Sequence, residues 1–155
     1  MQGIIKAVCV SEAKGTEKHP VASAHLTVNH GIDGDAHAGP WHRQVSLLSY
    51  EKVEEFNRRG AQVTDGAFGE NLLVSGIDFR SLPLGTVFRT AETELRLTQI
   101  GKECHSHCAI FHRVGTCIMP HEGVFAEVLK GGTVTPGEIM TVELPPEEGT
   151  PIGNT

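Results

Sequence analysis

The sequence has few aromatic residues and few basic ones. One Trp and one Tyr occur among its 155 residues, and Lys and Arg total 13 against 19 Asp and Glu, which gives a formal net charge of -6. Domains that bind nucleic acid normally carry a basic face. The acidic balance therefore argues against general nucleic-acid binding, and we expect a partner of another kind.

Long apolar runs are also missing. No stretch approaches the roughly 18 continuous apolar residues of a membrane-spanning helix, and the first residues, MQGIIKAVCVSEAKG, lack the apolar core and cleavage site of a signal peptide. We therefore expect a cytoplasmic protein without a membrane partner. Thiols in that compartment stay reduced, so the four cysteines are better interpreted as metal-binding, catalytic or buried than as disulfides.

The length and the 39% of hydrophobic residues are typical of one globular domain. Short apolar runs between glycine-rich turns predict strands at residues 4–10, 24–29, 43–48, 71–74, 87–90, 94–100 and 138–144. The strands at 87–90 and 94–100 are close enough to form a hairpin, with Leu95 and Leu97 on one face.

Two helices are predicted between these strands. Ser49 can cap the first, from residue 50 to about residue 59, with Val53 and Phe56 facing inward. The second begins at residue 120 or 121 and ends before the glycine pair at 131–132. Its apolar face would consist of Val124, Phe125, Val128 and Leu129.

These elements define the expected fold class. We expect a β-rich α+β domain over residues 1–144, with a curled or closed, barrel-like sheet and two or more short helices. Residues 145–155 are predicted to form a disordered tail, because they are polar and rich in proline and glycine.

Three of the four cysteines and four of the nine histidines lie in one segment, GKECHSHCAIFHRVGTCIMPHE, residues 101–122. Cys104 and Cys108 are four residues apart, and Cys117 and His121 repeat that spacing. Thiolate and imidazole are the ligands that Zn²⁺ prefers, so these four residues are a candidate structural zinc site.

The same segment also fits a reactive thiol. Lys102 and His105 could lower the pKa of a nearby thiol and so expose a nucleophile or a metal-binding sulfur. The simplest alternative is that the cysteines are small buried hydrophobic residues and the histidines face solvent. The residues of this segment leave all three interpretations open.

A second polar motif, GIDGDAHAG, spans residues 31–39. Its glycines, Gly34 among them, allow a ligand to approach the backbone, and exposed N–H groups there can bind an anion. Asp33, Asp35 and His37 could instead contact a metal ion. A turn in which the Asp side chains bond their own backbone is the structural alternative.

Two further short polar segments precede apolar strands. His42 and Arg43 stand where a strand leaves the glycine-rich loop, and they could meet a phosphate or carboxylate, for which Arg offers a bidentate fork. Glu70 and Asn71, in FGENL, come before the strand at 71–74. A buried Glu70 would need a partner, and Asn71 can pin a loop.

Taken in order, the motifs GIDGDAHAG, HRQVSLL, FGENLLVSGID, LPLGTVF, ELRLTQIGKEC and GGTVTPGEIMTV resemble the molybdenum cofactor sulfurase C-terminal (MOSC) domain family. The resemblance runs from about residue 3 to residue 144, and the segment that follows ELRLTQIGKEC is similar to the small stand-alone bacterial type. It implies a β-barrel-like fold and a link to molybdenum cofactor or sulfur transfer.

The resemblance also implies roles for residues. A cysteine in the region of Cys104 and Cys108 would carry sulfur or bind molybdenum. Basic and glycine-rich loops would hold the pterin and its phosphate. Carried over to this chain, the cofactor-binding residues would be Gly34, Asp35, His37, His42, Arg43, Glu70 and Asn71.

The chain lacks the aminotransferase-like domain of the pyridoxal-phosphate-linked sulfurases in this family, so we do not expect a complete sulfurase. We expect it to bind molybdenum cofactor or molybdenum, or to carry sulfur on a cysteine thiolate, with molybdopterin or another small anion as ligand and a sulfur-donor protein as partner. One alternative is a zinc-stabilised binding module without turnover, built on Cys104, Cys108, Cys117 and His121. Another is a molybdenum-dependent reductase of N-hydroxylated compounds.

Overall fold

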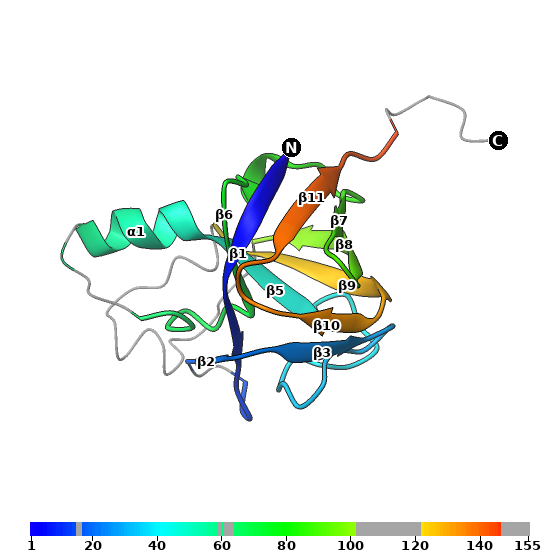
Figure 1. Cartoon of the computed structure of the whole chain (residues 1–155), viewed down its shortest axis with the longest axis horizontal. Helices are drawn as coiled ribbons and strands as arrows, with labels where there is room; N and C mark the ends of the chain where they lie inside the picture. Colours follow the sequence, from blue (N-terminus) through cyan, green and yellow to red (C-terminus); the bar gives the residue numbers. More distant parts are fainter. Residues whose placement is uncertain (15–16, 59, 61–63, 102–121, 147–155) are drawn as a thin grey trace.

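The computed structural model describes residues 1–14, 17–58, 60, 64–101 and 122–146. In this part of the chain the dominant elements are short strands (Figure 1). In order they are β1 (Gln2–Val10), β2 (His19–Val21), β3 (Ala24–Thr27), β4 (Gly31–Ile32), β5 (Val45–Ser49), α1 (Tyr50–Arg58), β6 (Leu72–Ser75), the 3₁₀ turn η1 (Phe79–Ser81), β7 (Val87–Arg89), β8 (Glu94–Ile100), β9 (Val124–Lys130), β10 (Gly132–Val134) and β11 (Ile139–Glu143).

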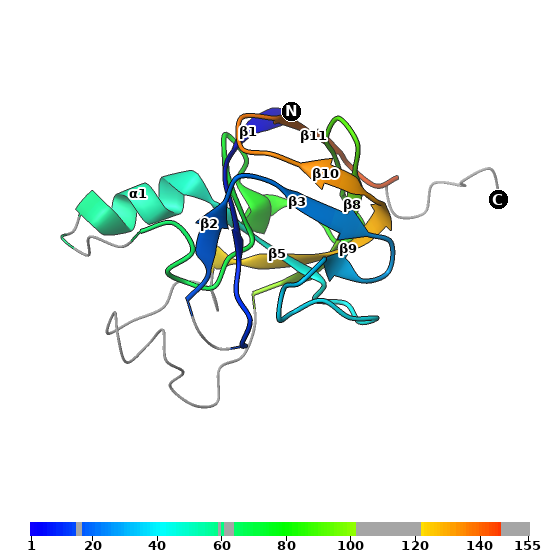
Figure 2. The same cartoon turned by 60° about the horizontal axis from the view of Figure 1, so that its bottom comes forward.

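Seven strands close into a barrel. Their order is β11-β7-β8-β9-β5-β6-β1, and β1 pairs with β11, with Gln2 opposite Thr141 and Ile4 opposite Ile139. β5 and β6 run parallel, while the other pairings around the barrel are antiparallel. The far half of β1 also pairs with β2, and a three-stranded sheet, β10-β3-β4, lies beside the barrel (Figure 2).

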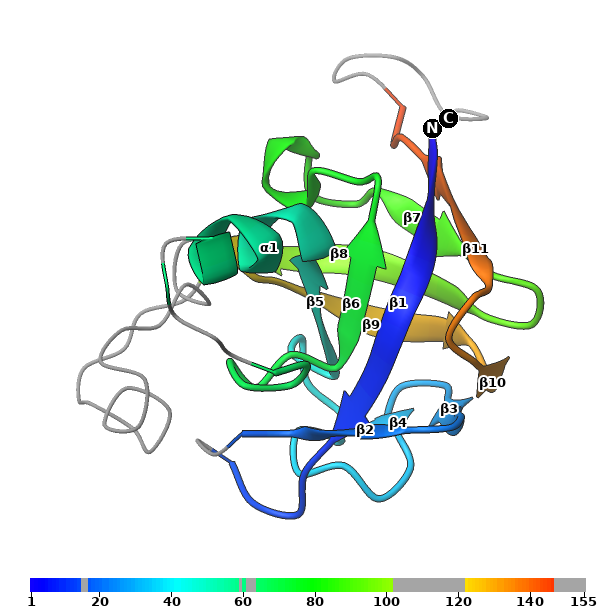
Figure 3. The same cartoon turned by 60° about the vertical axis from the view of Figure 1, so that its left-hand side comes forward.

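Two apolar clusters hold the fold together. The larger one fills the barrel with alternate residues of its strands, such as Leu95 and Leu97 of β8. The smaller one lies on the other face of the sheet, where α1 packs beside β5 and β6 (Figure 3). Val53 of α1 is buried there, and Phe56 meets Phe68 edge to face at 5.3 Å between ring centres. β5 and β6 are therefore covered on both faces, which explains their nearly continuous apolar sequences.

Most of the predicted elements are confirmed. Each predicted strand has a counterpart, the hairpin of β7 and β8 is present, and α1 forms at the predicted place. The hydroxyl of Ser49, which was predicted to cap α1, donates outside the helix, to the carbonyl of Ile77 at 2.5 Å. Gly60 follows the helix with a positive φ of 98°. The short strands β2, β4 and β10 were not predicted.

The helix predicted from residue 120 or 121 to about residue 130 is wrong from Val124 onward, although Glu122 itself is helical. Residues Val124–Lys130 form β9, which hydrogen-bonds to β5 on one side and β8 on the other. Val124 and Val128 point into the barrel, whereas Phe125 joins the cluster under α1. Apolar residues at these spacings fit either element, and the two open sheet edges beside this segment favour the strand.

The structure bears on two other expectations, the disordered tail and the absence of a membrane-spanning helix, only within the described residues. Of the predicted tail, only residues 145–146 belong to the described residues. No helix among the described residues is long and apolar enough to span a membrane.

Candidate functional site

The parallel pairing of β5 and β6 brings the motifs HRQVSLL and FGENL together. Leu47 lies opposite Leu72, so Ser46 of β5 is the neighbour of Asn71, which directly precedes β6. Asn71 is fully buried, and its Oδ1 accepts from the backbone N–H of Ser46 at 2.9 Å and from its hydroxyl at 3.1 Å. Its Nδ2 donates to the carbonyl of Cys9 at 3.0 Å. Asn71 therefore ties β1 to β5, which is the pinning role the sequence suggested.

Glu70 is also fully buried, and it holds its own loop. Its two carboxylate oxygens accept from the backbone N–H groups of Gly66, at 2.7 Å, and Phe68, at 3.1 Å. Burial raises the pKa of Glu70 to about 7 although these donors favour the charged form. Gly66 has a φ of 87°, and a Cβ there would lie 2.1 Å from the carbonyl oxygen of Lys18. The loop therefore requires glycine at this position.

A lysine that the sequence analysis did not single out lies at the centre of the neighbouring loop. The ammonium of Lys18 donates to Asp35 Oδ1 at 2.8 Å, to Ser11 Oγ at 3.0 Å and to His37 Nδ1 at 3.1 Å. The side chains of Lys18 and Asp35 are both 0% exposed. Buried charges are tolerated when they are paired and fully hydrogen-bonded, as here.

Asp35 completes this network through the backbone. It accepts from the N–H of Ser11 at 3.0 Å and from that of His37 at 3.1 Å. Burial alone would raise the pKa of Asp35, but the hydrogen bond and charge of Lys18 and the two backbone donors hold it below its usual value. The bond to the N–H two residues on is the turn that the sequence offered as a structural alternative.

The remaining residues of GIDGDAHAG point elsewhere. Asp33 is half exposed and bonds to Thr27 Oγ1 at 2.7 Å and His25 Nδ1 at 3.0 Å. Asp33 and Asp35 thus have separate partners, and the described residues contain no group of three His, Cys, Asp or Glu arranged to hold a metal ion. Gly34 has a φ of 83°, and no described atom lies within 4 Å of the place where its Cβ would be.

A cluster of cations and aromatic rings, the cation cluster, surrounds Trp41 and consists of Lys14, Trp41, His42 and Arg43. Trp41 lies parallel to His37, with 6.5 Å between ring centres, and its Nε1 donates to the His37 carbonyl at 2.8 Å. The Lys14 ammonium lies 4.8 Å from the centre of the Trp41 ring, and the exposed His42 meets that ring edge-on. The carbonyl of His42 accepts from Thr98 Oγ1.

Arg43 is the best-defined cation of this cluster. Its guanidinium carbon lies 5.8 Å from the ring centre of Trp41 and 5.5 Å from that of Phe125. Its Nε donates to Gln99 Oε1 at 3.1 Å, and the Gln99 amide donates in turn to the carbonyl of Gly101 at 2.7 Å. Gln99 lies opposite Phe125 in the sheet. Two rings and an amide therefore orient Arg43.

The predicted thiol site lies outside the described residues, which resume at Glu122 after Gly101. This applies to Lys102, Cys104, His105, Cys108, Cys117 and His121. The cysteine that is described, Cys9, is fully buried. Burial, assisted by the charges of Glu70 and Asp65, raises the pKa of Cys9 to about 12, so this thiol is protonated at neutral pH.

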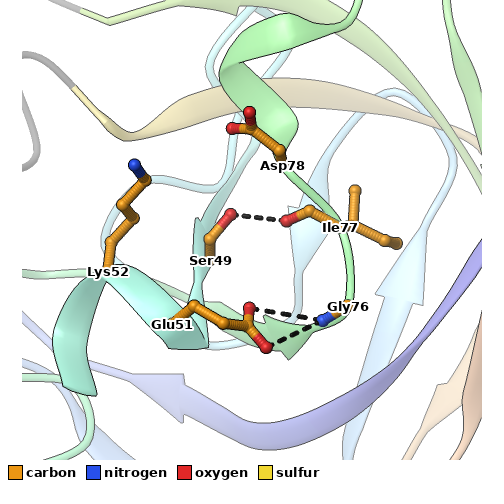
Figure 4. A pocket seen from close by; sticks show the side chains of 6 residues that line it. All are labelled: Ser49, Glu51, Lys52, Gly76, Ile77 and Asp78. Carbon is orange, nitrogen blue, oxygen red and sulfur yellow. Dashed lines mark hydrogen bonds between the residues drawn. The ribbon is translucent and has the colours of Figure 1, made fainter. Parts of the chain in front are cut away.

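A pocket of about 420 Å³ lies at the other end of β5, where α1 begins (Figure 4). The carboxylate of Glu51 accepts from the backbone N–H of Gly76 at 3.1 Å and so closes part of its wall. None of the predicted site residues that the structure describes lines this pocket. Its lining consists of Ser49, Glu51, Lys52, Gly76, Ile77 and Asp78.

Sequence reasoning missed Lys18 and Gln99. Neither belongs to a polar motif: Lys18 stands before a short strand that was not predicted, and Gln99 lies inside a correctly predicted one. Their roles depend on contacts with residues 17 and 56 positions away, for which a single sequence gives no signal.

Known proteins resemble this chain in sequence or in fold. YflK of Bacillus subtilis (strain 168), an uncharacterized protein, is 27% identical over 151 residues, which cover 89% of this chain and 67% of YflK. The crystal structure of YuaD from Bacillus subtilis matches with a TM-score of 0.76 at 18% identity, over 92% of this chain and 96% of YuaD. YiiM from Geobacillus stearothermophilus matches with a TM-score of 0.70 at 21% identity, over 92% of this chain and 75% of YiiM.

The sequence model of the MOSC domain matches residues 33–141. This region contains the buried Asp35, the Trp41–Arg43 cluster, the loop with Glu70 and Asn71, five of the seven barrel strands and the first part of β11. The chain belongs to the MOSC domain family.

Proposed function

We propose that this protein binds molybdenum cofactor, or a smaller anionic molybdenum species, beside Trp41 and Arg43, and that a thiolate of Cys104 or Cys108 binds the metal or carries sulfur. MOSC domains are associated in general with molybdenum cofactor. The observation that carries the proposal is the orientation of Arg43 by Trp41, Phe125 and Gln99.

The cation cluster fits an anionic group. Because Nε of Arg43 is engaged by Gln99, the planar guanidinium is fixed, and its two terminal nitrogens offer a fork of the kind that binds phosphate or another oxyanion. Lys14 and His42 add positive or hydrogen-bonding groups around the same indole ring. Arg43 is half-buried, which weakens the screening of its charge by water.

The thiolate in this proposal comes from the cysteine segment, residues 101–122, and not from Cys9. A soft thiolate suits molybdenum and is also the form that accepts sulfur, whereas Cys9 is buried and protonated. The proposal therefore rests on Cys104 or Cys108, with Lys102 or His105 favouring the thiolate. When bound, the cofactor would supply a metal centre that can change its oxidation state.

Sulfur transfer would need a second protein. The thiolate of Cys104 or Cys108 would attack the terminal sulfur of a cysteine persulfide on the donor, forming a new S–S bond while the donor cysteine leaves as a thiolate. No net oxidation or reduction occurs in this exchange. We propose a persulfide-carrying sulfur donor as the partner of this chain.

Native mass spectrometry of protein incubated with molybdenum cofactor, or with a persulfide donor, tests the proposal. The proposal predicts that Arg43→Gln weakens cofactor binding about tenfold, the change that 1.4 kcal/mol produces. It also predicts that Cys104→Ser or Cys108→Ser abolishes the added persulfide mass.

Cys117→Ser is the matched control, and it should leave both properties intact. If neither of the other cysteine variants changes binding or persulfide formation, the thiolate role is wrong. If the purified protein instead carries stoichiometric zinc that Cys117→Ser and Cys104→Ser remove alike, the zinc-stabilised binding module replaces this proposal.

A further inference from the structure

Lys18 has three N–H donors, and each has an acceptor within 3.1 Å. An ammonium group can only donate hydrogen bonds. The hydroxyl of Ser11 can accept from Lys18 because it donates its own proton to the carbonyl of Ala13 at 3.0 Å. Asp35 accepts as a carboxylate. The third acceptor, Nδ1 of His37, must therefore present a lone pair.

This requirement fixes the state of the His37 ring. A ring with a proton on Nδ1 would direct an N–H bond at the ammonium 3.1 Å away. Asp35 offers no alternative partner, since its Oδ2 lies 3.9 Å from Nδ1, beyond hydrogen-bond distance. His37 is then neutral, with its single proton on Nε2.

The same network reaches the cation cluster. Trp41 packs parallel to His37 and bonds to its carbonyl, and Trp41 is one of the two rings against Arg43. Lys18 itself is tied to the adjacent loop, because its backbone N–H donates to the carbonyl of Gly66 at 2.8 Å. The buried Lys18 thus anchors the loop that carries His42 and Arg43.

We propose that Lys18 is a positioning residue of this site: its ammonium holds His37 as the neutral tautomer with the proton on Nε2, and through His37 and Trp41 it orients Arg43. The Nδ1 of His37 is then closed to a metal ion. The last step, from Arg43 to anion binding, rests on the proposed function. The tautomer of His37 does not.

The tautomer can be measured in the wild-type protein. Long-range ¹H–¹⁵N correlation spectra of uniformly labelled protein at neutral pH distinguish a protonated ring nitrogen from an unprotonated one. We expect His37 to show an unprotonated Nδ1 and a protonated Nε2. A protonated Nδ1 would overturn the assignment without any substitution.

Lys18→Met removes the ammonium at similar side-chain length. In a folded Lys18→Met protein we expect His37 to lose the fixed tautomer and to give averaged ring signals. We also expect the affinity for molybdate, used as the probe anion, to fall about tenfold. Lys6→Met is the control, because Lys6 also lies over an aromatic ring, that of Tyr50, but on the exposed face of β1.

The two proposals fail in different ways. If Lys18→Met leaves the spectrum of His37 unchanged, or if it weakens molybdate binding no more than Lys6→Met does, Lys18 is not the positioning residue. If Arg43→Gln leaves molybdate binding intact while His37 shows the expected tautomer, the anion site is wrong and the role of Lys18 toward His37 stands. Should Lys18→Met not fold, the wild-type spectrum still decides the tautomer.

Discussion

The loops at residues 33–43 and 64–71 look alike in sequence, since both are polar, rich in glycine and followed by an apolar strand. In the structure they differ in where their hydrogen bonds go. Glu70 and Asn71 are fully buried and bond to the backbone of their own loop and of neighbouring strands. Arg43 and Trp41 stay half-exposed around a cation cluster. The loop at 33–43 therefore keeps side chains accessible to solvent, whereas the polar side chains at 70–71 support the fold.

The same contrast exists within one motif. Asp33 and Asp35 are two residues apart, yet Asp35 is buried on Lys18 and Asp33 is exposed between Thr27 and His25. Both carboxyl groups have a lowered pKa, Asp33 through its bonds to Thr27 and His25 and Asp35 through Lys18 against the effect of burial. A lowered pKa therefore does not separate a structural carboxylate from a surface one, whereas burial does.

Asp35→Asn should have the largest effect. It leaves the ammonium of Lys18 buried without its counter-charge, and breaking a buried pair in this way costs about 3–5 kcal/mol. Urea unfolding of the variant and the wild type at neutral pH measures the loss. A change in the free energy of unfolding below about 1 kcal/mol would mean that the pair is as weak as an exposed one.

Glu70 should make stability depend on pH. Its pKa is about 7 in the folded protein and 4.5 as the ordinary value, so the folded state binds the proton more tightly. The contribution of Glu70 to the free energy of unfolding is complete below its ordinary pKa of 4.5. It is lost as the pH rises through the folded pKa of about 7, by roughly 3 kcal/mol in total.

Glu70→Gln cannot ionise, so it isolates this effect. The wild type should be more stable than Glu70→Gln at about pH 5, and the gap should shrink toward about pH 8. Asp35 stays ionised over this range because its pKa is lowered. Urea unfolding of both proteins across the range gives the difference, and a constant gap would contradict the raised pKa of Glu70.

Arg43→Gln should separate binding from stability. Arg43 contacts the exposed cluster and Gln99, so we expect a loss of stability below about 1 kcal/mol together with a tenfold weaker binding of the anion (about 1.4 kcal/mol). Thermal unfolding and molybdate titration of the same sample measure the two effects. A large loss of stability would place Arg43 with Glu70 and Asn71 as a supporting residue.

Asp33→Asn should have the smallest effect, and it is the matched control for Asp35→Asn. Asp33 is half exposed, and exposed ion pairs contribute about 0–1 kcal/mol. Urea unfolding should place this variant close to the wild type. If both Asp→Asn variants lose the same free energy, the distinction between the two carboxylates by burial is wrong.

Local pattern predicted the barrel strands because alternation and β-branched residues specify them directly, as in β8, where Leu95 and Leu97 face inward. The same local pattern was misleading at Val124–Lys130, since a strand buried on both faces and a helix share apolar spacings. The pairing of β9 with β5 and β8 is a long-range property that decides between them.

The candidate site was predictable only in part. The sequence pointed to Arg43, Asp35 and Asn71 because they stand in recognisable motifs. It did not indicate Lys18, because a lysine in a short polar stretch is normally solvated, and only the folding of its loop onto Asp35 buries it. Which motif faces a ligand depended on burial, which the composition of the two loops does not reveal.

The pairing of β1 with β11 has a consequence for protein engineering. The first and last strands of the barrel are adjacent, and the carbonyl of Met1 accepts from the N–H of Val142 at 3.0 Å. A polypeptide therefore enters and leaves this barrel at one place. Circular permutation should be tolerated there with a short linker, and the barrel can be inserted into an exposed loop of another protein without forcing that loop apart.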